Sequence, residues 1–116
     1  MKTHRIVAPE QGRIEIEEVE LPALSAGLVM VQHKYSAISP GTELAWLHHL
    51  SNTPGRYPYY PGYSAAGIVV DRHESVDSLE IGQHVASSAI HAGHVVTEAG
   101  QCVPIPDAVE LKAAAP

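Results

Sequence analysis

Residues 61–70 read P-G-Y-S-A-A-G-I-V-V, and this stretch decides the fold expected for the rest of the chain. Its first half is made of small residues and its end is β-branched. Small residues within a strand let another backbone approach closely, and β-branched residues favour extended structure. We therefore expect a buried strand here, whose glycine-containing half passes close to a neighbouring segment.

Further strand candidates lie on both sides of this stretch. Residues 28–38 are rich in residues that favour strands and lie between a glycine and a proline, which predicts a long central strand. Residues 13–21 alternate apolar and acidic side chains, but the apolar phase slips by one between Ile16 and Val19. That slip predicts a half-exposed strand with a bulge. Shorter strands are expected at residues 83–86, 94–97 and 101–105.

Helix-forming residues are confined to two places. Ser39, Pro40 and Glu43 suit the N-cap, the first position and the first turn of a short helix. Residues 110–115 have strong helix propensity. Residues 51–61 hold three prolines and three tyrosines and are expected to form an irregular connection. The fold class predicted from this order is mainly β, an irregular β-barrel with one or two short helices.

The composition fits one globular domain and excludes several classes of function. The 116 residues carry a net charge of −6, which is the wrong sign for binding the phosphates of nucleic acids. No apolar run reaches the roughly 18 residues of a membrane span, and residues 1–8 lack the core of a signal peptide. The one cysteine excludes an internal disulfide. We expect a cytoplasmic protein without nucleic acid or membrane partners.

Five short motifs follow one another in an order typical of one protein family. They are G-R-I-E-I-E-E-V-E-L-P at 12–22, the strand at 28–38, P-G-Y-S-A-A-G-I-V at 61–69, I-G-Q-H-V-A at 81–86 and V-P-I-P-D at 103–107. The chain resembles the N-terminal, GroES-like domain of the medium-chain dehydrogenase/reductase superfamily, which includes zinc-type alcohol dehydrogenases and quinone reductases. The third motif resembles the pattern P-G-H-E-x-x-G-x-V, and the last two resemble V-G-D-R-V and K-I-P-D. This resemblance implies the GroES-like irregular β-barrel.

Two of these motifs depart from the zinc-binding members of the family. S-A-I-S-P-G-T-E at 36–43 and G-Y-S at 62–64 resemble the variant found in relatives of bacteriochlorophyllide dehydrogenase and in threonine-dehydrogenase-like enzymes. Zinc enzymes of the family carry a Cys and a His where this chain has Ser39-Pro40 and Tyr63. Neutral hydroxyls are poor zinc ligands, so no zinc is expected. Cys102 matches no metal position and is expected to be a partly buried thiol on a late strand.

The resemblance also implies a set of candidate site residues. Thr42 stands where family members carry the hydroxyl that relays the substrate's proton, and Ser39 lies in the same catalytic loop. The alternative for Thr42 is that it caps the following helix. Tyr63, Ser64 and Trp46 are candidates for lining the substrate pocket, with core packing as the alternative for Trp46.

Aromatic and histidine residues outside these motifs leave alternatives open. The tyrosines of the Pro-rich connection, Tyr57, Tyr59 and Tyr60, either cover the cleft or pack over the barrel. The pairs His48-His49 and His91/His94 could bind an adventitious metal ion. However, neighbours on a helix, and residues three apart on a strand, point in different directions. No intended metal site is predicted from them.

Enzymes of this superfamily transfer hydride to or from a nicotinamide bound on a Rossmann-type domain. No G-x-G-x-x-G fingerprint occurs in residues 1–116, so NAD or NADP is expected only with that missing domain. The resemblance therefore implies the substrate domain of a truncated or split zinc-independent NAD(P)-dependent oxidoreductase, inactive alone, acting on an alcohol or carbonyl compound. The alternative is a stand-alone GroES-like binding or assembly module without enzymatic activity. Association into a homo-oligomer is left open.

Overall fold

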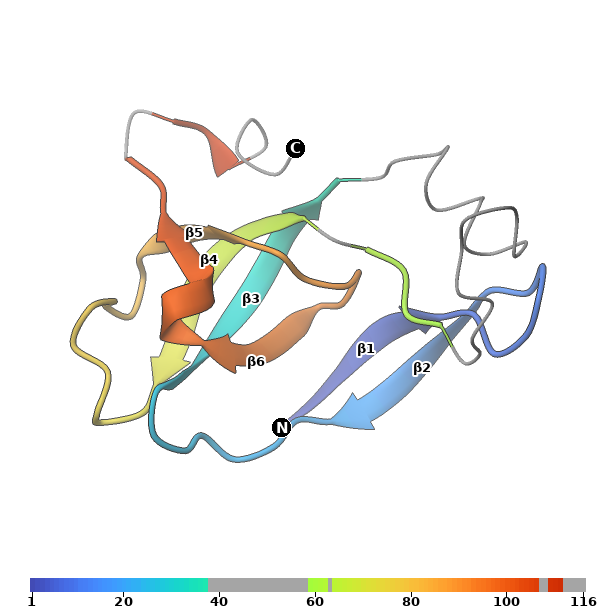
Figure 1. Ribbon diagram of the computed structural model, residues 1–116, viewed down its shortest axis with the longest axis horizontal. Helices are drawn as coiled ribbons and strands as arrows, with labels where there is room; N and C mark the ends of the chain where they lie inside the picture. Colours follow the sequence, from blue (N-terminus) through green and yellow to red (C-terminus); the bar gives the residue numbers. More distant parts are fainter. Residues whose placement is uncertain (38–58, 63, 107–108, 112–116) are drawn as a thin grey trace.

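The computed structural model describes residues 1–37, 59–62, 64–106 and 109–111 of the chain, and these are mostly β-strands (Figure 1). The mainly β fold class expected from the sequence is confirmed. The elements are β1 (Lys2–Val7), β2 (Glu15–Glu20), β3 (Leu28–Ser36), β4 (Ala65–Arg72), β5 (His84–Ser87), β6 (His94–Glu98), the short 3-10 helix η1 (Ala99–Gln101) and β7 (Cys102–Pro104).

The strands form two antiparallel sheets, which contact each other along β1 and the residues around the start of β6. β1 pairs with β2, and the larger sheet has the order β6-β3-β4-β5-β7. An antiparallel bridge between Arg5 of β1 and Ala92 joins the two sheets just before β6 begins. Figure 1 shows the larger sheet curling around its long strands β3 and β4, with the β1–β2 hairpin beside β6. The result is a curled, half-barrel arrangement.

β4 is the buried strand that residues 61–70 predict. Ala65, Ala66 and Val69 have no exposed surface. A Cβ atom at Gly67 would lie 2.9 Å from the carbonyl carbon of Gln32 in β3, because the two backbones run so close together. The small residues therefore allow β3 and β4 to approach each other closely at the centre of the sheet, as the sequence predicted.

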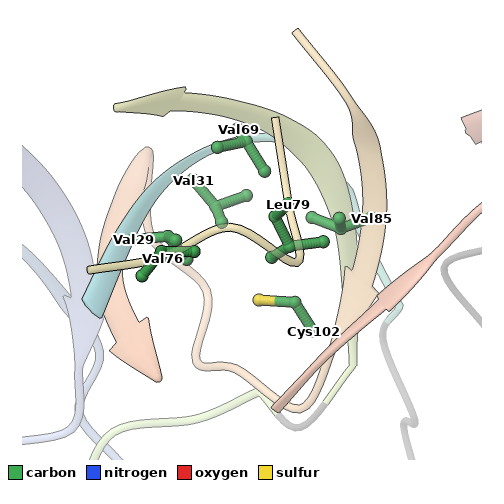
Figure 2. Close-up of a cluster of buried hydrophobic side chains, with 7 residues drawn as sticks. All are labelled: Val29, Val31, Val69, Val76, Leu79, Val85 and Cys102. Atoms are coloured by element: carbon green, nitrogen blue, oxygen red, sulfur yellow. The ribbon is translucent and has the colours of Figure 1, made fainter. Parts of the chain in front are cut away.

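A cluster of aliphatic side chains fills the inside of the curl (Figure 2). Val29 and Val31 alternate along β3, so both point to the same face, where Val69 of β4 joins them. The connection between β4 and β5 closes over this face with Val76 and Leu79, which are 6% and 2% exposed. Burial of such side chains supplies most of the favourable free energy of folding.

The β1–β2 hairpin corrects two expectations. The register from Lys2↔Glu20 to Val7↔Glu15 is continuous, so the bulge predicted in residues 13–21 is absent from this pair of strands. The apolar phase slips because Ile16 faces solvent, at 73% exposed, while the half-buried Arg5 and Glu17 form an ion pair at 2.6 Å. The hairpin also joins β2 to the N-terminal strand β1, which the sequence patterns did not predict.

Register shifts occur instead between β3 and β4. They lie between Met30 and Val31 and between His33 and Tyr35. Bulges of this kind increase the local twist and bend a strand, which suits the curl of the larger sheet. The first shift leaves Val70 of β4 without a partner in the ladder, and the second leaves Lys34 of β3 without one, so each strand carries one irregularity.

Both expected helices fall largely outside the described residues. This applies to the helix predicted to begin at Ser39 and to residues 112–115 of the second predicted helix. Most of the irregular connection expected at 51–61 also lies outside the described residues. Among the residues that the structure does describe, no helix is long and apolar enough to cross a lipid bilayer.

Candidate functional site

The predicted site residues lie on two stretches of the sequence, residues 39–46 after β3 and residues 63–64 before β4. Ser64, a predicted substrate-binding residue, is partly buried immediately before β4. Its carbonyl oxygen accepts a hydrogen bond of 2.9 Å from the amide of Ala37, the residue that follows β3. The other predicted site residues, Ser39, Thr42, Trp46 and Tyr63, lie outside the described residues, and their roles stay predictions. The structure thus brings together the ends of the two stretches.

The Pro61-Gly62 pair is packed against the backbone of Ile90 and His91. The amide of His91 donates a hydrogen bond of 2.9 Å to the carbonyl oxygen of Pro61. Gly62 has a φ of 111°, and a Cβ atom there would lie 2.8 Å from the carbonyl carbon of Ile90. Because the obstructing atoms belong to the backbone, only glycine fits at this position. The first two residues of the P-G-Y-S-A-A-G-I-V motif are therefore fixed against the backbone of Ile90 and His91.

His91 lies at the centre of this contact and is only 8% exposed. Its Nδ1 and the hydroxyl of Ser36, the last residue of β3, form a hydrogen bond of 2.7 Å. Its carbonyl oxygen accepts a hydrogen bond of 2.9 Å from the amide of Ile6 in β1. Sequence reasoning considered this residue only as an adventitious metal ligand and missed these contacts. The small residues that follow it were the one local sign of close packing.

Two further histidines lie in the same region, where β3 meets β6. Nδ1 of His33 donates a hydrogen bond of 3.0 Å to the carbonyl oxygen of Ala92, and its buried Nε2 has no partner among the described residues. Burial lowers the pKa of His33; the backbone hydrogen bond opposes this, and the nearby imidazoles of His94 and His91 lower it further. Burial and the charge of Lys34 lower the pKa of His94.

Tyr59 and Tyr60 pack on β1. The backbones of Tyr59 and Ala8 exchange two hydrogen bonds of 2.7 and 2.8 Å. The guanidinium group of Arg5 lies 4.2 Å from the centre of the Tyr60 ring, a cation–π contact, and 3.3 Å from its hydroxyl. These contacts show that both tyrosines pack against the N-terminal segment.

Residues 25–107 match the family model described as the alcohol dehydrogenase GroES-like domain. The chain belongs to this family. Alcohol dehydrogenase class-3 of Cereibacter sphaeroides is 36% identical over 86 residues, which cover 73% of this chain and 22% of that protein. S-(hydroxymethyl)glutathione dehydrogenase of Paracoccus denitrificans is 35% identical with the same coverage. The matched part of this GroES-like domain thus spans about a fifth of each curated relative.

Solved structures of the same superfamily share the fold. The CAD protein of Helicobacter pylori, solved with NADP(H), has a TM-score of 0.87 at 12% identity, over 99% of this chain and 44% of that one. The human synaptic vesicle membrane protein VAT-1 homolog-like protein has a TM-score of 0.82 at 24% identity, over 99% and 39%. Quinone oxidoreductase of Escherichia coli, solved with NADPH, has a TM-score of 0.77 at 22% identity, over 97% and 36%. The chain therefore has the same fold as these proteins.

Side chains that bind metals are dispersed in the described part of this GroES-like domain. No group of three or more His, Cys, Asp or Glu residues there could hold a metal ion. Nδ1 of His94 lies 3.3 Å from the hydroxyl oxygen of Thr3, with which it can form a hydrogen bond. Cys102 lies in the core on β7, where burial raises the pKa of its thiol. The expected thiol on a late strand is confirmed, and it is buried, at 7% exposed.

The lowered pKa of His33 predicts a loss of stability in mild acid. Above its ordinary pKa of 6.5 the imidazole is neutral in both states. Below that value the unfolded chain binds the proton more readily than the folded chain, so the free energy of unfolding falls as the pH falls. His33→Asn can keep a donor for Ala92 and cannot titrate, so its stability should decline less between pH 7.5 and pH 5.5.

Urea unfolding at several pH values in this range measures the difference. His94 remains in both proteins, so burial of its imidazole contributes to the pH dependence of both. Equal pH dependence of the two proteins would show that His33 does not resist protonation in the folded state.

Proposed function

We propose that this domain is the substrate-side part of an oxidoreductase that transfers hydride between NAD(P) and a small alcohol or carbonyl compound. The observation that carries the proposal is the family match over residues 25–107, which extends from before β3 to beyond β7. Both curated relatives are named as dehydrogenases, and two of the solved neighbours are described as complexes with NADP(H) or NADPH. These names support nicotinamide as the cofactor.

The nicotinamide would be bound on a second, Rossmann-type domain. The chain covers between 36% and 44% of the three solved neighbours, so each of them has long stretches with no counterpart in residues 1–116. No glycine-rich dinucleotide fingerprint occurs in this sequence. Bound on that domain, the nicotinamide supplies or takes the hydride. Residues 1–116 alone are expected to be inactive.

The domain's own part would be to hold the substrate and to move a proton. Reduction of a carbonyl group needs a proton on oxygen as well as a hydride on carbon. The hydroxyls of Thr42 and Ser39 can donate or accept that proton. Tyr63 and Ser64 supply hydroxyls that orient the substrate, and Trp46 supplies an apolar wall. The hydrogen bond between the end of β3 and Ser64 supports this grouping, because it joins the two stretches.

We further propose that this reaction needs no catalytic zinc. The family's zinc-binding members carry a Cys and a His where this chain has Ser39-Pro40 and Tyr63. Zinc prefers thiolate, imidazole and carboxylate, and the hydroxyls of Ser and Tyr are neutral at pH 7. These residues therefore do not fit the metal. Polarisation of the substrate oxygen would rest on hydrogen bonds from hydroxyl groups instead.

Titration of the ¹⁵N-labelled chain with small aldehydes, ketones and alcohols tests the proposed substrate site. We expect amide signals of Ala37 and Ser64 to shift at millimolar ligand, because these residues join the two stretches that carry the site. A Ser64→Ala variant, which keeps the backbone hydrogen bond, should bind more weakly. NADH and NADPH should leave the spectrum unchanged.

Two outcomes would contradict this assignment. Saturable binding of NADPH to residues 1–116 would mean that the nucleotide site lies on this domain. Shifts confined to the outer face of β2, around Ile16, would place small-molecule binding away from the proposed site.

Zinc content is expected to stay far below one ion per chain after the untagged protein is dialysed against micromolar zinc, as measured by atomic absorption. The matched variant combines Pro40→Cys with Tyr63→His, which places a thiolate and an imidazole in the two motifs. It should retain more zinc than the natural sequence. Stoichiometric zinc in the natural sequence, lost in Tyr63→Ala, would refute zinc independence.

A further inference from the structure

The residues just before β6 are hydrogen-bonded on both sides. On one side the amide of Ile6 donates to His91 and the amide of Gly93 donates to His4, each at 2.9 Å, which attaches the segment to β1. On the other side the amide of His33 in β3 donates to the carbonyl oxygen of Gly93 at 2.8 Å. The backbone of this segment is therefore fixed between the two sheets.

From this fixed position His91 reaches the two stretches that carry the candidate site. Its imidazole is hydrogen-bonded to Ser36 at 2.7 Å. Ser36 is the last residue of β3, and the stretch that carries Ser39 and Thr42 follows it in the sequence. Its amide is hydrogen-bonded to Pro61 at 2.9 Å, at the start of the stretch that leads into β4. One buried residue thus contacts both the end of β3, at Ser36, and the start of the segment that leads into β4, at Pro61.

The two contacts differ in what they can tolerate. The amide contact with Pro61 belongs to the backbone and survives any ordinary substitution at position 91. The contact with Ser36 needs a side chain with a nitrogen or oxygen at the position of Nδ1. The backbone at the end of β3 is paired with β4 through Ser36 and Ala65. The imidazole adds the contact that holds the exposed side chain of Ser36 against the segment before β6.

We propose that His91 is a positioning residue, which sets where the end of β3 lies relative to residues 61–64. Its effect on catalysis rests on the proposed function, because it would act through residues of the two stretches rather than by touching the substrate. The structural part of the claim needs no activity. It requires only that loss of the hydrogen bond between the imidazole and Ser36 changes the surroundings of Pro61 and Gly62, which pack against His91.

Three variants separate positioning from packing. His91→Leu keeps an apolar side chain of similar size, His91→Asn keeps a polar group near the position of Nδ1, and Ser36→Ala removes the partner at an exposed position where folding should be unaffected. Both changes at residue 91 remove the aromatic ring and its ring-current shift. The difference between them therefore excludes the ring current, and agreement with Ser36→Ala shows how much of it comes from the hydrogen bond with Ser36.

Amide hydrogen exchange of His91 and Ala37, together with ¹⁵N chemical shifts of Gly62 and Ser64, provides the measurement. We expect His91→Leu and Ser36→Ala to raise the exchange rates of the His91 and Ala37 amides about tenfold, as the loss of one partly buried hydrogen bond predicts. His91→Asn should restore most of the protection. The double variant should exchange no faster than His91→Leu, because both changes break the same contact. Val69, in the core of β4, should be unaffected.

Other results would overturn the proposal. Additive effects of the two single changes, or equal behaviour of His91→Leu and His91→Asn, would mean that His91 contributes packing only. If His91→Leu does not fold, Ser36→Ala decides, and unchanged signals at Gly62 and Ser64 in that variant would refute the coupling. Failure of small carbonyl compounds to bind would remove the proposed function but would leave these readouts, and the positioning claim, intact.

Discussion

The contact between Pro61-Gly62 and Ile90-His91 is the constraint on which the rest of this structure depends. No side chain fits at Gly62, since a Cβ atom would collide with backbone atoms of Ile90. The same two backbone segments share a hydrogen bond, and His91 extends the contact to β1 and to the end of β3. The hairpin, the larger sheet and the segment leading into β4 therefore meet at a single place.

The two sheets and the contact between them form the scaffold of this GroES-like domain. The aliphatic cluster on the inside of the curl stabilises β3, β4 and β5, and the bridge at Arg5 and Ala92 attaches the hairpin. The stretches that carry the candidate site residues leave and re-enter this scaffold at Ala37 and Ser64, which are hydrogen-bonded to each other. Sites in this position are held by the scaffold, while their loops remain free to differ between relatives.

Local sequence patterns predicted the strands whose apolar or small side chains face the core. The small and β-branched residues of β4 and the long apolar run of β3 gave correct strands, because their side chains face the core. β1 was not predicted from residues 1–8, since its backbone pairs with β2 and its inward positions hold Thr3 and Arg5 as well as Val7, so no apolar alternation marks it. His91 was missed because its partner Ser36 is 55 residues away. Of the predicted site residues, Ser64 is described, and the family resemblance remains the basis for the others.

The most direct measurement of the central constraint compares Gly62→Ala with Gly27→Ala by urea unfolding. Both glycines have positive φ, 111° and 81°, but a Cβ atom at Gly27 would meet nothing within 4 Å. Both variants carry backbone strain, and only Gly62→Ala adds a collision with the backbone of the neighbouring segment. The account predicts that Gly62→Ala loses about 3 kcal/mol more stability than Gly27→Ala. Equal losses in the two variants would contradict it.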